Sequence, residues 1–307
     1  MNTIEQNLLA EIADIHSVPE GAYNIRANGM LDSRNTTANI DIVTKTENGK
    51  SGIDIIIAPG TKNESVHIPV IISKTGLSDL VYNDFYVGED ADVTIVAGCG
   101  IHNSGDKESG HDGIHTFHLA KNARVKYIEK HVGGGDGKGK NIMNPTTIVN
   151  LDEGAYLEME TSQIRGIDST NRITKAKVAD NATIIVHEKI MTHGDQFAGT
   201  DFTVDLDGVG SSANVVSRSV ARDNSTQKFV SLINGNNECN GHTECDAIIM
   251  DNGRVTAVPE LTANHIDASL IHEAAIGKIA GEQLIKLMTL GLTEAEAEEQ
   301  IVNGFLK

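Results

Sequence analysis

A short unit recurs through the middle of the chain, and it restricts the fold more than any other feature of the sequence. Each unit has a turn, an alanine, one variable residue and an apolar strand. The alanines are Ala91, Ala123, Ala155, Ala182 and Ala213, at spacings of 32, 32, 27 and 31 residues. A repeat that keeps its length while other residues change is typical of coils stacked on one another. The spacing therefore predicts a β-solenoid, and the alternative is an antiparallel sandwich with evenly spaced hairpins.

The two ends of the chain have a different, helical pattern. Apolar residues at helical spacing predict a helix over residues 3–16, before the β-rich segment that begins near Tyr23. A second apolar stripe predicts a helix from His272 to Gly291. A capping box at Thr293 then begins a last helix that runs to about residue 303.

These patterns together predict a mainly β chain with short helical ends. We expect an N-terminal helix within residues 1–22, a solenoid core over 23–262 and a C-terminal helical subdomain over 263–307. Hydrophobic residues make up 39% of the 307 residues and Trp is absent, so the core must consist mainly of Val, Ile, Leu and Ala.

Charge and cysteine content limit the partners and the compartment. The formal net charge of −18 argues against nucleic acid or an anionic membrane as the main partner, since both need clustered Lys and Arg. Three cysteines, at positions 99, 239 and 245, are too few for a secreted disulfide framework. The first residues resemble no signal peptide and no window approaches 18 apolar residues, so we expect a soluble, cytoplasmic protein.

One group of candidate functional residues surrounds Cys245. His242, Glu244 and Asp246 are its neighbours in sequence, and His272 with Glu273 follows later. Thiolate, imidazole and carboxylate form a mixed ligand set that suits iron or zinc, and a thiol there could also accept sulfane sulfur. The alternative is that Cys245 is an inert, buried small residue.

A second group is rich in histidine and follows Cys99. His102, His111 and His115 lie in a Gly- and Ser-rich segment, with His118 just beyond. The spacing resembles a zinc site on a helix, but the local pattern is a loop followed by a strand. His115 and His118 would then point to opposite faces of the strand, so solvated loop histidines are favoured over a bound metal.

Three motifs stand out in the C-terminal segment: T-x-C-D at 243–246, HEA at 272–274 and the ending IVNGF at 301–305. With these motifs the segment resembles the SufB/SufD family of iron-sulfur cluster assembly proteins. Upstream, the Gly-Cys pair at 98–99 is similar to the family's E-G-C element, and KNARVKY at 121–127 is similar to one of its strands. The resemblance covers about residues 80–307.

The resemblance implies a fold, a role and a partner. It implies a right-handed parallel β-helix core flanked by helices. It implies a scaffold on which sulfide and iron are assembled into a transiently bound iron-sulfur cluster, not an enzyme in itself. It also implies a SufC-like ABC ATPase that docks on about residues 270–307, together with a sulfur donor and recipient apoproteins.

The resemblance also implies residue roles. Cys245 is expected to be the main sulfur-accepting and cluster-binding thiol, with Glu273 and His272 as further ligands. Cys99 is expected to receive sulfur first and pass it through the interior of the β-helix, while the role of Cys239 stays open. Because these ligands occur in one chain, we expect a homodimer with two equivalent sites.

The chain also departs from the family pattern. It lacks the family's long N-terminal region, so no flavin is expected. Ala97 replaces the glutamate of the E-G-C element, so the surroundings of Cys99 differ. Two other functions remain alternatives: a SufD-like partner subunit that is not itself the scaffold, and a carbohydrate-active β-helix protein that uses His102, His111 and His115.

Overall fold

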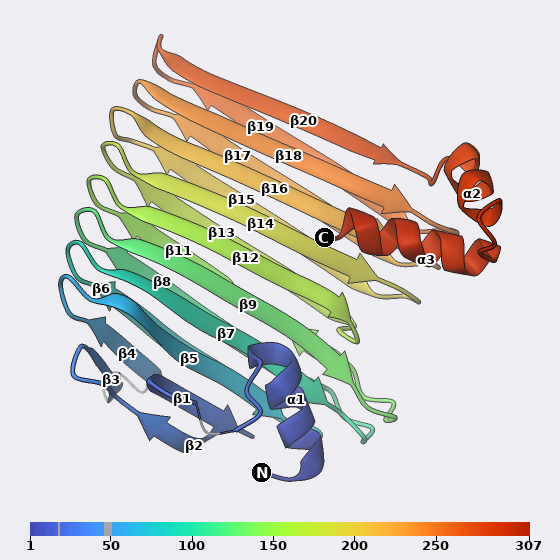
Figure 1. Cartoon of the computed structure of the whole chain (residues 1–307), viewed down its shortest axis with the longest axis horizontal. Helices are drawn as coiled ribbons and strands as arrows, with labels where there is room; N and C mark the ends of the chain where they lie inside the picture. Colours follow the sequence, from blue (N-terminus) through green and yellow to red (C-terminus); the bar gives the residue numbers. More distant parts are fainter. Residues whose placement is uncertain (18, 46–50) are drawn as a thin grey trace.

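Parallel strands wind into a solenoid with two long faces in the computed structural model of the chain, which describes residues 1–17, 19–45 and 51–307 (Figure 1). Within these residues each face is a ten-stranded sheet, and successive coils contribute strands to both sheets in turn. Among the described strands, antiparallel pairing is confined to the first turns, β1 with β2 and β3 with β4. The prediction of a mainly β solenoid with helical ends is confirmed, and the antiparallel sandwich is excluded.

The first sheet contains β2 (Met30–Asn35), β1 (Ala22–Ala27), β5 (Lys62–Ile72), β7 (Asp92–His102), β9 (Arg124–Gly134), β12 (Tyr156–Arg165), β14 (Thr183–Thr192), β16 (Ser211–Ala221), β18 (Cys239–Ile249) and β20 (Ala268–Gly277), in that spatial order. The second sheet contains β3 (Ile40–Thr44), β4 (Gly52–Ile57), β6 (Ser78–Val87), β8 (Ser109–Leu119), β10 (Asn141–Met143), β11 (Thr146–Leu151), β13 (Ser169–Val178), β15 (Phe197–Leu206), β17 (Thr226–Gly235) and β19 (Arg254–Ala263). β10 and β11 share one position between β8 and β13.

The repeated alanines form the inner edge of a stack of turns. Ala91, Ala123, Ala155 and Ala182 are buried, and the carbonyl oxygen of each accepts a backbone N–H from the next coil at 2.8–2.9 Å. Asp, Asn or Gly precedes each alanine in the left-handed conformation that these residues tolerate best. The small side chain lets consecutive turns lie directly over one another.

The last unit of the predicted repeat is out of register. Ala213 lies opposite Ile184, two residues further along the strand than expected, and Ser211 takes the place of the stacked alanine. Cys239 and then Ala268 continue the same stack. Cys239 is thus explained by packing, because it is one more small residue in this row.

The N-terminal helix α1 (Thr3–Ala13) covers part of the first sheet over β5, β7 and β9 (Figure 1). It begins with an Asn2 capping box and ends at Asp14 in the left-handed conformation, slightly before the predicted end at residue 16. A Cβ at Gly100 would lie 3.1 Å from the Leu8 side chain, so the glycine allows the helix to lie close to β7. The helix therefore packs on the outer side of the strand that carries Cys99.

The first of the two C-terminal helices begins later than the sequence pattern predicts. The segment 272–277 belongs to β20, and the first helix, α2 (Gly281–Met288), starts nine residues after His272. This segment pairs in register with β18, so its successive residues point to opposite faces of the sheet. The second helix, α3 (Glu294–Phe305), begins at the predicted Thr293 capping box and lies across the first sheet (Figure 1).

Candidate functional site

Cys245 lies on the inner face of β18, one coil before the end of the solenoid. Its side chain is 1% exposed, and its register neighbours are Ser217 on β16 and Ala274 on β20. Burial, together with the charges of Glu188 and Asp246, raises the pKa of Cys245 to about 12. Since the thiolate is the nucleophile and the metal ligand, the group in this resting chain is a protonated thiol at neutral pH.

His272 and Glu273 come from opposite faces of β20. His272 is on the inner side, and its Nδ1 lies 3.2 Å from the carbonyl oxygen of Thr243. Glu273 is on the outer side, where its in-register neighbour on β18 is Glu244. Within one chain, Cys245 and Glu273 are therefore separated by the thickness of the sheet.

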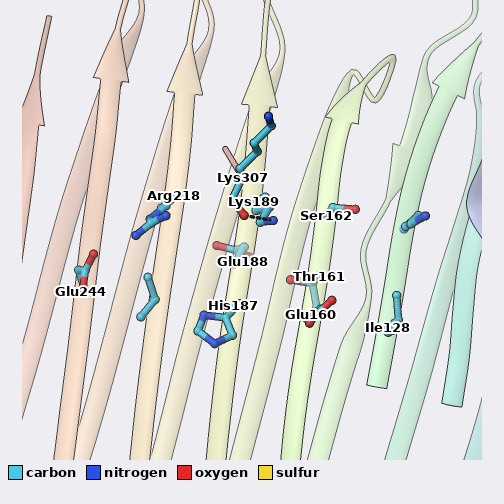
Figure 2. A pocket seen from close by; sticks show the side chains of 12 residues that line it. Ile128, Glu160, Thr161, Ser162, His187, Glu188, Lys189, Arg218, Glu244 and Lys307 are labelled. Atoms are coloured by element: carbon cyan, nitrogen blue, oxygen red, sulfur yellow. Dashed lines mark hydrogen bonds between the residues drawn. The ribbon is translucent and has the colours of Figure 1, made fainter. Parts of the chain in front are cut away.

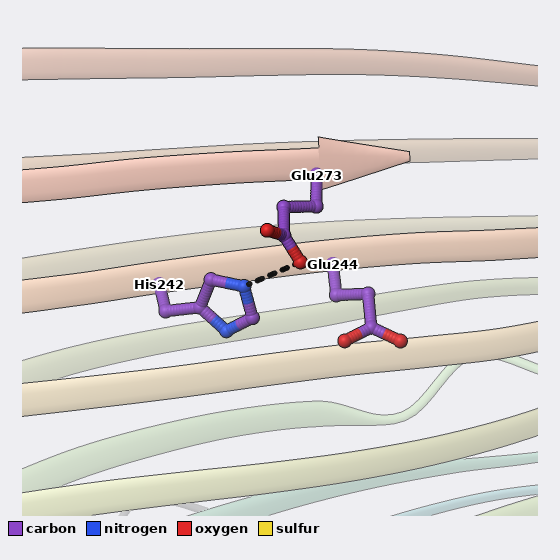
Figure 3. Close-up of side chains that lie close together, drawn as sticks. All are labelled: His242, Glu244 and Glu273. Atoms are coloured by element: carbon purple, nitrogen blue, oxygen red, sulfur yellow. Dashed lines mark ion pairs between the residues drawn. The ribbon is translucent and has the colours of Figure 1, made fainter. Parts of the chain in front are cut away.

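Glu273 instead meets two other side chains on the outer face (Figure 3). Its Oε2 lies 3.6 Å from Nε2 of His242, and Glu244 lies beside both. The three residues each offer one ligand atom, and these atoms all lie within 4.8 Å of one another. The sequence places His242 and Glu244 next to Cys245, but the alternation of the strand directs them away from the thiol.

Cys99 lies on the inner face of β7, five strands away from β18 in the first sheet. Its side chain is 1% exposed and lines a cavity of about 10 Å³ with His111, His115, Glu129 and His131 among its other walls. Burial, with added effects of Asp79 and Glu129, holds the pKa of Cys99 well above its ordinary value. This thiol is also protonated at rest.

The histidine-rich segment is a strand rather than a solvated loop. His111 and His115 are buried on the inner face of β8, and Gly113 between them leaves space because a Cβ there would lie 3.1–3.4 Å from both rings. His118 points outward and stacks on Tyr86, as the predicted alternation requires. The expectation of solvated loop histidines is wrong for His111 and His115, since coil stacking encloses them.

His102 does not join these two histidines. It is half-buried at the end of β7, and its Nε2 lies 3.0 Å from Ser104 Oγ. Of the three predicted accessory ligands, the structure brings together only His111 and His115, in the cavity beside Cys99. Burial lowers the pKa of His115 to about 4, so the ring that faces Tyr127 is neutral.

A buried charged network fills the interior between the two cysteines. Arg172, on β13, is held between two carboxylates of the first sheet. Its Nη1 lies 2.5 Å from Glu129 Oε2, its Nε lies 3.4 Å from Glu188 Oε1, and its Nη2 lies 3.1 Å from His131 Nδ1. Glu188 also accepts hydrogen bonds from Thr200 at 3.0 Å and Ser217 at 2.8 Å.

The two carboxylates differ in their electrostatics. Burial alone would raise the pKa of Glu129, but the charges of His131 and Arg172 outweigh it and hold this pKa well below its ordinary value. Burial raises the pKa of Glu188 and is only partly offset by Arg172. The network therefore contains one firmly ionised carboxylate and a second that is easier to protonate.

Sequence reasoning missed this network, although a signal for it exists. Glu129, Thr161, Glu188, Ser217 and Cys245 occupy one register row, each at an inward position of an alternating strand. Polar residues or a thiol at one inward position of five successive strands, two of them glutamates, are unusual. Aligning the repeats strand by strand would have placed them in one row.

A groove of about 470 Å³ lies on the outer face of the first sheet beside Glu244 (Figure 2). Lys130, Lys189 and Arg218 project into it from one register row, and Lys189 Nζ donates to the backbone carbonyl oxygen of Lys307 at 2.8 Å. Lys307, just after α3, thus closes one side of a groove that is lined by both cationic and acidic residues.

The last coil and α2 leave apolar side chains exposed. Ile266 is 93% exposed and Ile271 53%, both on or near the edge strand β20. In α2, Ile285 is 63% exposed, and the helix buries none of its residues against the described chain. Contiguous exposed apolar residues mark surfaces that bind other proteins.

Comparisons with known proteins agree on one family. Residues 78–305 match a family model described as SUF system FeS cluster assembly, SufBD core domain. In the part of the chain that the structure describes, every helix is too short or too polar to cross a membrane.

Several archaeal relatives carry names from the same family. A protein of Methanocaldococcus jannaschii, named as an iron-sulfur cluster assembly SufBD family protein, is 29% identical over 265 residues, which are 85% of this chain and 83% of the relative. A Methanothermobacter thermautotrophicus protein with the same family name is 31% identical over 231 residues, or 73% of this chain and 54% of the relative. One from Archaeoglobus fulgidus is 28% identical over 84% of this chain and 68% of its own length.

Proposed function

Because the chain belongs to the SufBD family of iron-sulfur cluster assembly, we propose that it is a scaffold on which sulfur and iron are built into a cluster. In this proposal it works with a SufC-like ABC ATPase, and the ATPase activity resides in that partner. The observation that carries the proposal is the continuous buried polar path between Cys99 and Cys245.

The path can be followed contact by contact. The cavity that Cys99 lines is also walled by His131 and Glu129, and both of these residues contact Arg172. Arg172 contacts Glu188, which accepts a hydrogen bond from Ser217, the register neighbour of Cys245. Thr161 Oγ1 and Gln163 Oε1, beside this path, are buried without a partner among the described residues. A core whose purpose was stability alone would have no need of these polar groups.

The length of the path limits how sulfur can move. Cys99 and Cys245 are separated by five strand spacings of about 4.8 Å each, or about 24 Å. Neither thiol can attack a persulfide on the other across this gap. In the proposal two small-molecule thiols reduce the persulfide on Cys99: its S–S bond breaks, the Cys99 thiol is regenerated, the two thiols become a disulfide, and the outer sulfur leaves as hydrosulfide. Arg172 and Ser217 supply donors to this anion along the path, and at Cys245 it joins iron as sulfide with the thiolate as a ligand.

The resting burial of Cys245 fits a gated scaffold. Its raised pKa and 1% exposure keep the thiol unreactive until β18 and β20 separate. In the proposal, ATP-driven closure of two ATPase subunits pulls on α2 and α3 and exposes the thiol. The three buried free cysteines are compatible with the reducing cytoplasm that we propose as the compartment.

The surfaces for the two partners lie at the C-terminal end. We assign ATPase docking to about residues 270–307, because the apolar side chains of α2, including Ile285 and Met288, are exposed. We assign homodimer formation to the open end of the solenoid, where β19 and β20 are the last strands of their sheets and each has one edge without a strand partner among the described elements. An exposed edge is a template for pairing with a second chain.

Dimerisation also addresses the arrangement of the proposed ligands. Cys245, His272 and Glu273 remain our proposed cluster ligands, yet one chain holds Glu273 on the face opposite to the thiol. We propose that they act together when β20 moves or when the second copy supplies a ligand. Mixed ligands suit a cluster that must later leave for a recipient apoprotein.

The test is anaerobic reconstitution of the chain co-purified with its ATPase. Iron, acid-labile sulfide and charge-transfer absorption are compared among wild type, Cys245→Ser and Cys239→Ser. The proposal expects a labile cluster in wild type and in Cys239→Ser, because Cys239 only fills the turn stack, and none in Cys245→Ser. Equal cluster content in wild type and Cys245→Ser would refute the assigned role of Cys245.

One observation favours a second candidate function. Cys245 is buried on all sides and has a pKa near 12, so in the resting chain it is unreactive. An unreactive thiol is compatible with a SufD-like partner subunit that has no scaffold role. This alternative predicts that wild type holds no cluster in the same reconstitution, while a mixed complex with a separate scaffold chain does.

A further inference from the structure

We propose that His242, Glu244 and Glu273 form a divalent-cation site on the outer face of β18 and β20, and that it holds iron without any thiolate. The resemblance groups Glu273 with Cys245, whereas the structure gives Glu273 a different set of neighbours on the opposite side of the sheet. The choice of ferrous iron as the natural ion rests on the proposed scaffold function, but the site itself does not.

The strand register brings the three ligands together. Glu244 and Glu273 are directly opposite each other on neighbouring parallel strands, and His242 lies two residues from Glu244 on the same face. The candidate ligand atoms lie within 4.8 Å of one another, and His242 Nε2 is 3.6 Å from Glu273 Oε2 (Figure 3). Bonds of about 2.0–2.2 Å to a metal require ligand atoms about 3–4 Å apart, so small side-chain rotations complete the set.

Asn214 prepares the imidazole for this role. His242 Nδ1 lies 2.8 Å from Asn214 Oδ1 on β16, and because a carbonyl oxygen only accepts, Nδ1 carries the hydrogen. In the neutral ring the lone pair is then on Nε2, which faces Glu273. Metal-binding histidines characteristically donate their second ring nitrogen to such an outer partner, which fixes the tautomer and the ring orientation.

The surroundings leave room for an ion and for further ligands. The side chains of His242 and Glu273 are 31% and 66% exposed, so an ion can enter from solvent and keep water in its open positions. One nitrogen and two carboxylate oxygens suit ferrous iron and its neighbours in the first transition series. Two carboxylates also neutralise the charge of a divalent cation.

The placement has a consequence for assembly. Iron on this site and sulfur at Cys245 would approach the same pair of strands from opposite sides, because Glu244 and Cys245 alternate along β18. Movement of β20, the edge strand, would bring the two sides together. Iron loading and sulfur delivery can then occur independently before they meet.

Arg218 is the nearby group that opposes cation binding. It shares the outer groove with Glu244, and its charge acts on that carboxylate (Figure 2). Replacing Arg218 by Gln should therefore tighten metal binding several-fold. A merely structural ion-pair cluster would show no such gain.

The experiment is an anaerobic titration of the purified full chain with Co²⁺, a spectroscopic neighbour of Fe²⁺, followed by Fe²⁺ competition. Wild type should bind one Co²⁺ per chain with weak d–d bands and without sulfur-to-cobalt charge transfer. His242→Ala and Glu273→Gln should each weaken binding at least as much as loss of an outer-shell partner, about 10- to 100-fold. Asn214→Ala should fall within that range.

Two matched variants serve as controls. Cys245→Ser should bind Co²⁺ as wild type does, and so should His265→Ala, which removes an exposed histidine 3.9 Å from Asp267. The inference is overturned if wild type binds no Co²⁺, or if His242→Ala and Glu273→Gln bind it as tightly as wild type. It is also overturned if the absorption spectrum of the Co²⁺-loaded chain shows thiolate charge transfer that Cys245→Ser abolishes. Co²⁺ binding in a chain that assembles no cluster would refute the scaffold function and leave this site intact.

Discussion

Replacing Arg172 by Met should destabilise the chain strongly, because it leaves a charged carboxylate alone in the interior. Arg172 and Glu129 are 4% and 3% exposed as side chains, and their closest atoms are 2.5 Å apart. Removing one partner of a buried ion pair costs about 3–5 kcal/mol, since the other charge stays buried and unpaired. That is a large part of the stability of about 5–15 kcal/mol that is typical of folded domains.

The expected change in melting temperature follows from chain length. An unfolding entropy of about 2.1 cal/mol/K per residue over 307 residues gives about 0.6 kcal/mol/K. A loss of 3–5 kcal/mol therefore corresponds to a decrease in Tm of about 5–8 °C. Thermal and urea unfolding, followed by circular dichroism, measure both quantities.

The matched control is Arg165→Met. Arg165 also contacts a carboxylate at 2.6 Å, that of Glu11, but the two side chains are 51% and 39% exposed. Exposed ion pairs contribute about 0–1 kcal/mol, so this variant should be nearly as stable as wild type. The double variant Glu129→Gln with Arg172→Met should recover part of the lost stability, because it removes the charge of Glu129, while Glu188 still lacks its contact with Arg172.

The pH dependence of the stability lost in Arg172→Met tests whether the unpaired charge of Glu129 is the cause. In wild type the pKa of Glu129 is depressed, so its contribution is present above its unfolded pKa and is lost as the pH falls through the lower folded value. Without Arg172 one of the charges that lower this pKa is lost, so the pKa of Glu129 should rise and the variant should become less unstable relative to wild type as the pH falls from 8 to 5. Equal costs for Arg172→Met and Arg165→Met, or a cost that does not change with pH, would refute the reasoning.

Three further predictions test other parts of the structure. Cys245 should react with iodoacetamide about 1,000-fold more slowly than an ordinary thiol, because its pKa is about 12 instead of 9.0. Addition of the ATPase with ATP should remove this protection. Peptide mass spectrometry measures both alkylation rates, and fast alkylation of the isolated chain would contradict the closed site. Gly100→Val should lower the free energy of unfolding by about 1–3 kcal/mol and loosen α1 from β7, since the new side chain meets Leu8. Unchanged hydrogen exchange over residues 3–13 would exclude this contact. The pKa of His115 is lowered to about 4 from 6.5, so the unfolded chain takes up a proton before the folded chain does as the pH falls from 6.5 towards 4. The free energy of unfolding should therefore decrease by up to about 3 kcal/mol over this range. The slope of stability against pH should be smaller in His115→Asn.

Cys245 and Glu273 illustrate where sequence reasoning reached its limit. Both were predicted as ligands of one site, on motifs that are close in sequence and shared with a family. In the structure the first points inward and the second outward, because β20 is a strand where a helix was predicted. A helix beginning at His272 would not force Glu273 away from the thiol, whereas in a strand His272 and Glu273 must point to opposite faces.

The buried charged network shows that local sequence also does not reveal contacts between distant strands. Glu129, Arg172 and Glu188 come from three different strands, and nothing in their local sequence marks them as partners. Only the register of the coils aligns them. That register depends on coil lengths that vary from one repeat to the next, as the displaced Ala213 demonstrates.

The sequence by itself determined the solenoid, the capping box of α3, the alternation at His118 and the family of the chain, because each depends on residues that are near one another or on a repeated pattern. Tertiary structure alone decided which face each functional side chain occupies, how deeply the two thiols are buried and which charges meet inside the coils. The physical reason is that parallel coils bring together residues about thirty positions apart, and stacking then sets the burial, the pKa and the neighbours of every side chain on the inner face.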